Sequence, residues 1–360
     1  MQAVRVVEYN KPYVLSTVPV PSDLEPHDLL VKVAVASYCH TDGMVAAGIY
    51  GTTLPCTASH EGAGTVVAVG PDVMDFRPGD RVMCGLPIGH CGECAECKGP
   101  ESQQHYCART AGLVGLLTDG CFADYVRVDA RWTTLLPDMV SFLSAAPLAC
   151  AGRTVWRGVR VAGVEPGGWL AIVGSGGGLG HLGVQFAKAK GLRVIGIDAR
   201  DEALTLSREY GADAVFDARE GQAEVVRKVQ EVVGAGPNGG ADATITLSDA
   251  DGAAALACAV TKMHGTMVQI AQPDTVKIPF HELINRDIRI HGSVLCSAQE
   301  SRDMVKFVAE HGISPKTKVF DGLDKIHELV EEVHRGKVQG KAAIIVDQGQ
   351  LGQEKHRKTQ

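Results

Sequence analysis

A glycine-rich run near the middle of the chain, GSGGGLG at residues 174–180, constrains the fold more than any other feature of the sequence. The apolar segment 169–173 before it is typical of a buried strand, and the segment 181–190 after it has the apolar spacing of a helix. Glycines between a strand and a helix allow a tight turn and let a pyrophosphate approach the backbone at the helix N-terminus. We therefore predict a dinucleotide-binding turn formed by Gly176, Gly177, Gly178, Leu179 and Gly180.

Alternating strand and helix signals follow this turn. Strands are expected at 193–198, 214–217, 243–247, 266–271 and 288–294, and helices at 202–210, 223–233 and 252–260. This alternation is typical of βαβ units around a parallel sheet. The sequence thus predicts a doubly wound Rossmann domain over residues 152–296.

The second strand of this predicted domain ends in Asp198, 18 residues beyond Gly180. A carboxylate at this place hydrogen-bonds the adenosine ribose hydroxyls and repels a 2′-phosphate, which favours NAD over NADP. Arg200 lies two residues further on and is able to accept a phosphate, so NADP stays the alternative.

The first 150 residues follow a different pattern, rich in Val, Gly and Pro. Strand-like runs at 29–35, 64–69, 81–84 and 122–128 are separated by proline and glycine turns. We predict an irregular β-rich domain over residues 1–151, completed by residues 297–360. That last segment contains two predicted helices, at 300–310 and 323–334, a strand at 342–346 and a polar tail expected to be frayed.

Charge and composition exclude several classes of function. The formal net charge of −7 over 360 residues disfavours nucleic acid as a partner. The first residues lack an apolar signal region, and no run of about 18 apolar residues suggests a membrane span. Eleven cysteines, an odd number, fit metal ligation in a reducing compartment better than disulfides. We expect a cytoplasmic protein with no membrane partner.

Four of these cysteines crowd into 17 residues, as a CxxCxxC run formed by Cys91, Cys94 and Cys97 and followed by Cys107. Four thiolates from one lobe predict a closed, structural Cys₄ zinc site. Free cysteines or an iron–sulfur cluster are the alternatives, and His105 is able to replace Cys107 as the fourth ligand.

Cys39, His60 and Cys150 form a candidate metal site of another kind. Two thiolates and one imidazole leave the fourth zinc position open, which is typical of a catalytic rather than a structural ion. The spacing of these residues is weak support on its own. The cysteine cluster and the glycine-rich turn strengthen it, because an alcohol-oxidising metalloenzyme needs both a metal and a hydride carrier.

Several motifs together resemble one family over nearly the whole chain. They are CHTD at 39–42, SHEGAGTVVAVG at 59–70, CGECAEC at 91–97, PLACAGRTV at 147–155, GGLG at 177–180 and GKVQGK at 336–341. The chain is similar to the zinc-dependent alcohol dehydrogenases of the medium-chain dehydrogenase/reductase superfamily, closest to the tetrameric microbial branch. The resemblance implies a GroES-like β-rich catalytic domain plus a Rossmann domain. It also implies two zinc ions per subunit, NAD and a homo-oligomer, either a tetramer or a dimer.

By this resemblance Cys39, His60 and Cys150 hold the catalytic zinc, and Glu61 is the neighbouring carboxylate of the metal set. Thr41 would hydrogen-bond the substrate oxygen and pass its proton outward. The implied chemistry is activation of the alcohol oxygen by zinc as a Lewis acid, with hydride transfer to nicotinamide.

The resemblance assigns further residues to the cofactor and to the metal ligands. His40 and Lys341 would face the cofactor pyrophosphate, and Thr154 and Leu179 would pack against the nicotinamide. Asp42 would fix the metal ligands from behind.

Three departures from the family pattern limit this transfer. Met44 stands where the family often has the histidine that ends the proton relay, so the proton needs another exit. Tyr50 and Leu86 replace two tryptophans that narrow the pocket, which predicts a wider pocket, and Gln272 adds a polar group near the nicotinamide. Nine residues separate the third and fourth cysteines of the cluster, where the family usually has seven.

The sequence therefore predicts a zinc-dependent oxidoreductase that interconverts an alcohol and an aldehyde or ketone with NAD(P), on a substrate bulkier than ethanol. A biosynthetic reductase of the same fold, acting on a conjugated C=C or C=N bond, is the alternative that the missing histidine favours. A non-catalytic nucleotide-binding protein is an alternative of another class, and the intact metal ligands argue against it.

Overall fold

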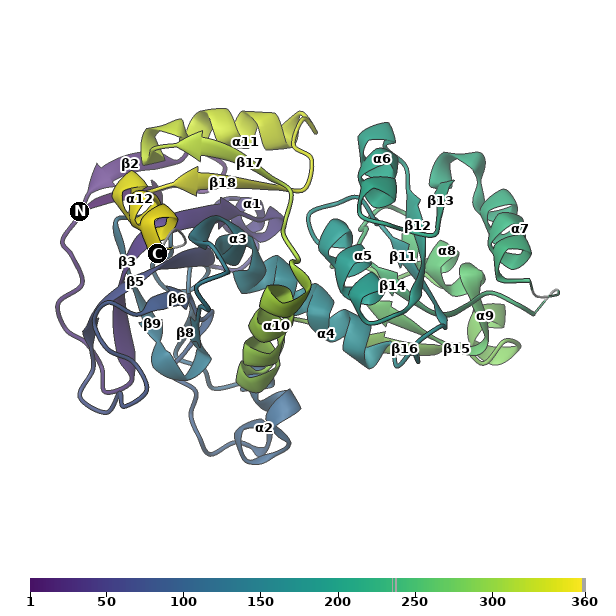
Figure 1. Cartoon of the computed structure of the whole chain (residues 1–360), viewed down its shortest axis with the longest axis horizontal. Coiled ribbons are helices and arrows are strands. Elements are labelled where there is room, and N and C mark those ends of the chain that lie inside the picture. Colours follow the sequence, from purple (N-terminus) through teal and green to yellow (C-terminus); the bar gives the residue numbers. More distant parts are fainter. Residues whose placement is uncertain (235, 237, 358–360) are drawn as a thin grey trace. The chain divides into compact units, whose positions relative to one another are not determined.

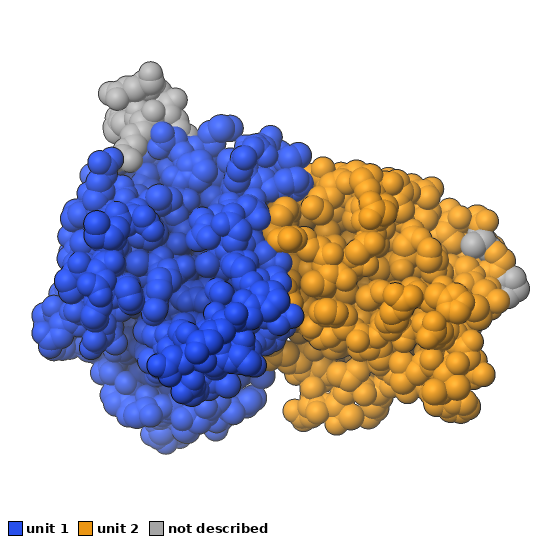
Figure 2. Space-filling model, turned by 90° about the horizontal axis from the view of Figure 1, so that it is seen from below, with its two compact units in different colours: residues 1–153, 296–360 blue, residues 154–295 orange. Residues whose placement is uncertain are grey.

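The chain forms two compact units, coloured separately in Figure 2. The computed structural model describes residues 1–234, 236 and 238–357. Unit 1 comprises residues 1–153 and 296–360, and unit 2 comprises residues 154–295. The sequence-based domain boundaries lie within two residues of these limits. Among the described residues, no helix combines the length and the apolar character that crossing a membrane requires.

Unit 1 is built on a seven-stranded sheet in the order β10-β6-β5-β3-β18-β17, with β9 paired to β3 (Figure 1). Its strands are β3 (Asp28–Tyr38), β5 (Glu61–Val69), β6 (Arg81–Met83), β9 (Tyr125–Asp129), β10 (Thr134–Leu135), β17 (Thr317–Asp321) and β18 (Lys341–Ile345). Smaller sheets join β1 (Gln2–Val6), β2 (Val14–Thr17) and β4 (Cys56–Thr57), and β7 (Pro87–Ile88) with β8 (Gly112–Leu113). The helices of this unit are α1 (His40–Ala46), α2 (Ala95–Lys98), α3 (Phe142–Pro147), α10 (Ala298–His311), α11 (Ile326–His334) and α12 (Gln348–Arg357).

The long strand β3 organises this sheet. Its last residues pair antiparallel with the first residues of β5 (Ser37 opposite Glu61) and of β18 (Tyr38 opposite Ala342). Antiparallel pairing brings the end of one strand beside the beginning of its neighbour. The residues next to these three strand ends therefore meet at one edge of the sheet.

The C-terminal segment differs from the sequence-based expectation of a frayed tail. It forms helix α12, in which Gln350 and Glu354 are buried, with 6% and 8% of their surfaces exposed. The Glu354 carboxylate pairs with the buried Arg81 and accepts a hydrogen bond of 3.0 Å from the backbone N–H of Phe142. The prediction was wrong for residues 348–354, because these buried side chains are polar and hydropathy gave no sign of their partners. The side chains from residue 355 onward lie outside the described residues.

Unit 2 is a six-stranded parallel sheet in the order β13-β12-β11-β14-β15-β16. Its strands are β11 (Trp169–Val173), β12 (Arg193–Asp198), β13 (Ala214–Asp217), β14 (Ala241–Thr246), β15 (Thr261–Gln269) and β16 (Arg289–Gly292). Its helices are α5 (Gly180–Ala189), α6 (Asp201–Glu209), α7 (Gln222–Val233), α8 (Ala253–Val260) and α9 (Phe280–Ile284), while α4 (Arg153–Val161) begins at the unit boundary.

This strand order is that of the Rossmann fold, which confirms the predicted fold class. Three strands, β11 to β13, coincide with their predicted ranges, whereas β15 begins five residues earlier than predicted. The order reverses between β11 and β14, and ligands of such sheets bind outside the carboxyl ends of the strands at this point.

Candidate metal centres and cofactor site

The first candidate centre lies at the edge of the unit 1 sheet where β3, β5 and β18 meet. Cys39 follows β3 directly and caps α1, and His60 precedes β5. Cys150 comes from a turn of π-helix, Leu148–Gly152, which continues α3, and α3 packs on β3 and β5. The ligand atoms of these three residues and of Glu61 all lie within 4.8 Å of one another.

Asp42 holds two of these residues at once. One carboxylate oxygen accepts a hydrogen bond of 2.7 Å from the backbone N–H of Cys39. The other lies 3.0 Å from Nδ1 of His60. An acceptor at Nδ1 places the imidazole proton on that nitrogen, so Nε2 keeps its lone pair for a metal. Asp42 thus occupies the orienting position that the sequence analysis expected.

Glu61 and Lys341 form a buried ion pair behind the ligands. The ammonium of Lys341 lies 2.9 Å and 2.8 Å from the two carboxylate oxygens of Glu61. Ser37 donates a further hydrogen bond to Glu61, and the N–H of Ala151 donates another, of 3.3 Å. Both carboxylate oxygens of Glu61 therefore accept hydrogen bonds from groups within the protein.

Lys341 was expected to face the cofactor pyrophosphate, and the structure shows its ion pair with Glu61. Only 4% of its surface is exposed, and its ammonium is directed to Glu61. A buried ammonium is retained only when a charge partner offsets its lost hydration, and Glu61 is that partner. No local pattern indicates this contact, because the two residues are 280 positions apart.

Burial and charge shift the pKa values of this cluster. Burial raises the pKa of Glu61 to about 7, against the opposing effect of Lys341. A hydrogen bond from the Cys150 thiol lowers the pKa of Cys39 well below its usual range, with help from Lys341. The thiolate is the form that binds metals, so the cluster favours the ligand form of Cys39.

The donor set fits a zinc ion. The Nε2 atom of His60 is buried and has no hydrogen-bond partner among the described residues, although the imidazole is only 1% exposed. Buried polar atoms normally have partners, and an ion between the imidazole and the two sulfurs would supply one.

The second candidate centre is the lobe of four cysteines. The Sγ atom of Cys91 lies 3.9 Å from the Sγ atom of Cys97 and 3.6 Å from that of Cys107. The Sγ atom of Cys94 lies 3.8 Å from that of Cys107. A tetrahedron with Zn–S bonds of about 2.3 Å has sulfurs about 3.8 Å apart, so these separations fit zinc. The 3₁₀ helix Glu101–Tyr106 lies within the nine-residue spacer, which returns Cys107 to the cluster.

Backbone amides also prepare this lobe for a metal. The N–H groups of Glu93 and Cys94 donate to the Cys91 sulfur at 3.5 Å and 3.4 Å. These bonds lower the pKa of Cys91 to about 6. His105 stacks at an angle on Tyr106 and is absent from the four-residue cluster.

The glycine-rich turn lies between β11 and α5 of unit 2, as predicted. A Cβ added at Gly176 would lie 2.0 Å from the backbone oxygen of Ala203, and one at Gly180 would lie 2.1 Å from that of Gly174. No larger residue fits at either position, so the turn is compact for steric reasons. Gly177, Gly178 and Leu179 occupy the remainder of the turn, at the N-terminus of α5.

Asp198 ends β12 beside this turn. Its carboxylate accepts hydrogen bonds from the N–H groups of Gly176, at 3.1 Å, and of Ala199, at 2.8 Å. Arg200 lies 3.7 Å from the same carboxylate, with 53% of its side chain exposed. Asp198 and Arg200 therefore lie beside each other at the end of β12, and Asp198 contacts the glycine-rich turn.

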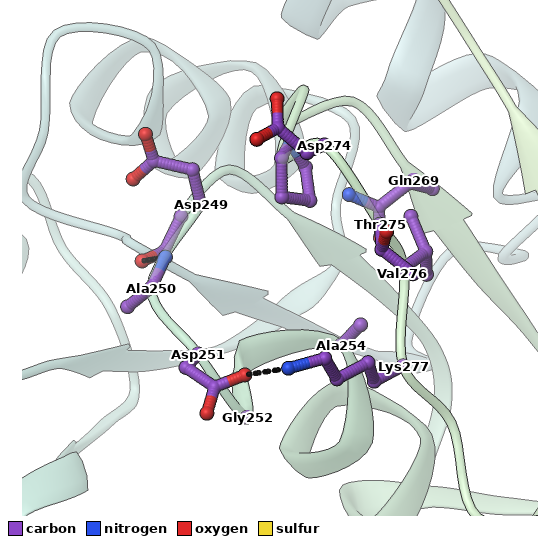
Figure 3. Close-up of a pocket in the computed structure, with 12 residues that line it drawn as sticks. Asp249, Ala250, Asp251, Gly252, Ala254, Gln269, Asp274, Thr275, Val276 and Lys277 are labelled. Atoms are coloured by element: carbon purple, nitrogen blue, oxygen red, sulfur yellow. Dashed lines mark hydrogen bonds and ion pairs between the residues drawn. The ribbon is translucent and has the colours of Figure 1, made fainter.

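A pocket of about 260 Å³ opens at the carboxyl ends of β14 and β15 (Figure 3). Asp249, Asp251 and Asp274 line it, and Lys277 lies 3.3 Å from Asp251. Because β11 and β14 are parallel neighbours, this pocket is at the same sheet edge as the glycine-rich turn. These acidic residues belong to no sequence motif and were not predicted.

The remaining predicted residues divide between the two units. In unit 1, His40 is exposed at the start of α1, Met44 lies on α1, and Leu86 is buried before β7. In unit 2, Thr154 is buried in α4, and Gln272 follows β15.

Two family models match the chain. An alcohol dehydrogenase GroES-like domain matches residues 25–138, and a zinc-binding dehydrogenase domain matches residues 178–310. An alcohol dehydrogenase of Geobacillus stearothermophilus is 32% identical over 96% of this chain and 100% of its own length. Alcohol dehydrogenase 1 of Emericella nidulans is 36% identical over 96% of this chain and 97% of its own length.

Solved structures show the same similarity. The alcohol dehydrogenase of the archaeon Aeropyrum pernix has a TM-score of 0.86 at 29% identity, covering 96% of this chain and 100% of its own. A cinnamyl alcohol dehydrogenase of Sorghum bicolor has a TM-score of 0.85 at 27% identity, covering 96% of this chain and 97% of its own. Together with the metal clusters and the Rossmann sheet, these matches show that the chain belongs to the zinc-dependent alcohol dehydrogenases of the medium-chain dehydrogenase/reductase superfamily, which interconvert alcohols and carbonyl compounds with NAD(P).

Proposed function

We propose that Cys39, His60 and Cys150 bind the catalytic zinc and that the four-cysteine lobe binds a second, structural zinc. The observation that carries the first assignment is the buried Nε2 of His60, which has no hydrogen-bond partner among the described residues and lies in a cluster with two sulfurs. When bound, zinc would supply a Lewis acid that polarises the alcohol oxygen and lowers its pKa.

The other residues of this centre have separate roles in the proposal. Asp42 orients His60 and fixes the backbone at Cys39. Lys341 offsets the charge of Glu61, which we assign to charge balance behind the ligands rather than to a permanent place in the metal set. Thr41 accepts the proton of the alcohol and passes its own outward, since an unassisted hydroxyl is far too weak a base to keep it.

Metal analysis of single variants tests these assignments. Wild-type protein is expected to hold two zinc ions per chain, and His60→Ala and Cys107→Ser are each expected to hold one. Cys107→Ser should keep the zinc at Cys39, His60 and Cys150 if it still folds, which circular dichroism checks. One zinc in the wild-type protein would refute the two-site assignment.

We assign the dinucleotide to the turn at residues 174–180 in unit 2, with Asp198 at the adenosine ribose. Gly176, Gly180 and the N-terminus of α5 provide the close backbone approach that a pyrophosphate needs. Asp198 favours NAD, although Arg200 beside it would support a 2′-phosphate. The ratio of kcat/KM for NAD⁺ and NADP⁺ decides this, and Asp198→Ala is expected to shift it toward NADP⁺.

We further propose a substrate bulkier than ethanol, for which Tyr50 and Leu86 are the supporting residues. The similar plant protein named cinnamyl alcohol dehydrogenase is consistent with an aromatic alcohol. Turnover of ethanol, benzyl alcohol and cinnamyl alcohol under equal conditions tests this, and a clear preference for ethanol would refute it. A deuteride-labelled cofactor separates the carbonyl reaction from reduction of a conjugated C=C bond, because the labelled product carbon differs.

A cytoplasmic homo-oligomer, either a tetramer or a dimer, completes the proposal. The edge strand β16 is exposed along its length. Beside it in sequence, helix α9 exposes 74% of Phe280 and 75% of Ile284. Exposed apolar side chains and an open strand edge favour association with a second copy. Light scattering measures the assembly, and a monomer at micromolar concentration would contradict it.

A further inference from the structure

The inferred alcohol oxidation needs a route for the substrate proton, and the histidine that often provides it in the family is replaced by Met44. Thr41 receives the proton, but its hydroxyl has to pass one on at the same time. A second group that both donates and accepts is therefore required beyond Thr41. A thioether cannot serve, since its sulfur is a weak acceptor with no proton to give.

Tyr50 lies where such a group is needed. Its hydroxyl donates to the Met44 sulfur at 3.8 Å. Met44 is three residues after Thr41 on α1, so the two side chains share one face of the helix. Thr41 in turn lies beside the metal ligands, with its Oγ1 atom 3.8 Å from the Cys39 sulfur.

The pKa of Tyr50 reflects its burial and its contact with Thr41. Burial raises the pKa of the phenol. A hydrogen bond from the Thr41 side chain acts in the opposite direction. Thr41 and Met44 are therefore both hydrogen-bond partners of the Tyr50 side chain. The side chain of Tyr50 is only partly buried, which leaves it able to meet water.

We propose that Tyr50 is the proton-relay residue of this enzyme, in place of the missing histidine. As the alcohol gives its proton to Thr41, Thr41 gives its own to the Tyr50 oxygen, and Tyr50 releases its own to water. Both hydroxyls end the step unchanged, one proton reaches the solvent, and the hydride leaves to NAD⁺. Met44 orients the phenol. A methionine at this position is tolerated in place of histidine because the Tyr50 hydroxyl carries out the proton transfer. This inference rests on the proposed alcohol dehydrogenase activity.

The test removes only the hydroxyl, in Tyr50→Phe, and measures hydride transfer in single turnovers of zinc-loaded enzyme with NAD⁺ and an alcohol. The rate constant is expected to fall about 100-fold, the lower end of what positioned proton transfer contributes. The solvent deuterium isotope effect should change with it, while zinc content stays at the wild-type value. Tyr9→Phe is the matched control, because that hydroxyl donates to the backbone carbonyl of Thr52 and has no relay role.

A second variant distinguishes a proton-relay role of Tyr50 from a role in shaping the substrate pocket. Adding Met44→His to Tyr50→Phe supplies an imidazole at the other position, and we expect it to restore most of the lost rate. An unchanged rate in Tyr50→Phe overturns the proposal. So does a loss that appears only in KM, that leaves the isotope effect unchanged, or that the imidazole fails to restore. Absence of alcohol oxidation in the wild-type protein would instead refute the proposed function.

Discussion

Replacing Asp42 by asparagine tests how the catalytic centre is held together. Asp42 is 1% exposed and uses both carboxylate oxygens as acceptors, one for the Cys39 N–H at 2.7 Å and one for His60 Nδ1 at 3.0 Å. Asparagine has the same shape but only one acceptor oxygen, so one of the two donors would face an NH₂ group. If that donor is His60, the imidazole proton moves to Nε2 and blocks the metal position.

The expected magnitude follows from the lost contact. A hydrogen bond to a charged group contributes about 1.5–3 kcal/mol, which corresponds to a roughly 10- to 150-fold loss of zinc affinity. Losses of about 10- to 100-fold are typical when the partner behind a metal ligand is removed. The four-cysteine lobe has no contact with Asp42 in the structure, so its zinc should be unaffected.

A chelator titration of the zinc-loaded protein measures both sites in one experiment. In Asp42→Asn, one of the two zinc ions should leave at a chelator concentration 10- to 150-fold lower than in the wild-type protein. Asp28→Asn is the matched control, because that residue lies at the opposite end of β3 and accepts from the backbone N–H of Glu25. Equal release of zinc from Asp42→Asn and wild-type protein would refute the reasoning.

Other substitutions test the contacts that the structure revealed. Lys341→Met leaves Glu61 buried without its cation, which should lower the free energy of unfolding by about 3–5 kcal/mol. The metal-free variant should therefore unfold at a lower urea concentration than the wild-type protein, and an equal midpoint would contradict the buried pair. Glu354→Gln removes the charge that pairs with Arg81, and hydrogen exchange in α12 should become faster, whereas unchanged protection would show that the helix docks without this pair. Gly176→Ala adds a Cβ only 2.0 Å from the backbone of α6, so calorimetry should show weaker binding of NAD⁺, and wild-type affinity would rule out the compact turn.

The Rossmann unit was predictable because its signals are local. Strand β11, the glycine-rich turn and α5 are consecutive, and backbone atoms of the adjacent α6 and of the turn itself leave no room for a Cβ at Gly176 and Gly180. The strand that ends in Asp198 is also read from its own six residues. Unit 1 was less predictable. Its strand β17 is mostly exposed and has a mixed pattern, and its short strands depend on pairing partners far away in the chain.

The cysteine lobe shows the same distinction on a smaller scale. Three of its ligands follow one another at CxxCxxC spacing, and the sequence left open whether Cys107 or His105 would be the fourth. The 3₁₀ helix Glu101–Tyr106 contains His105 and leads into Cys107, whose sulfur lies beside those of Cys91 and Cys94. The spacing of the cysteines predicts which residues lie near each other, whereas the path of the loop determines which side chain points toward the cluster.

The family, the two candidate metal sets and the glycine-rich turn could be predicted without a structure, because each is encoded by residue types at characteristic positions. The neighbours that act on those residues became visible only in the folded chain. The sheet register brings Lys341 to Glu61 across 280 positions, and the loop after α1 returns Tyr50 to Thr41. Each of these contacts joins chain segments whose local sequences are independent of each other. Strand pairing and packing bring the segments together, so no local motif predicts the contact.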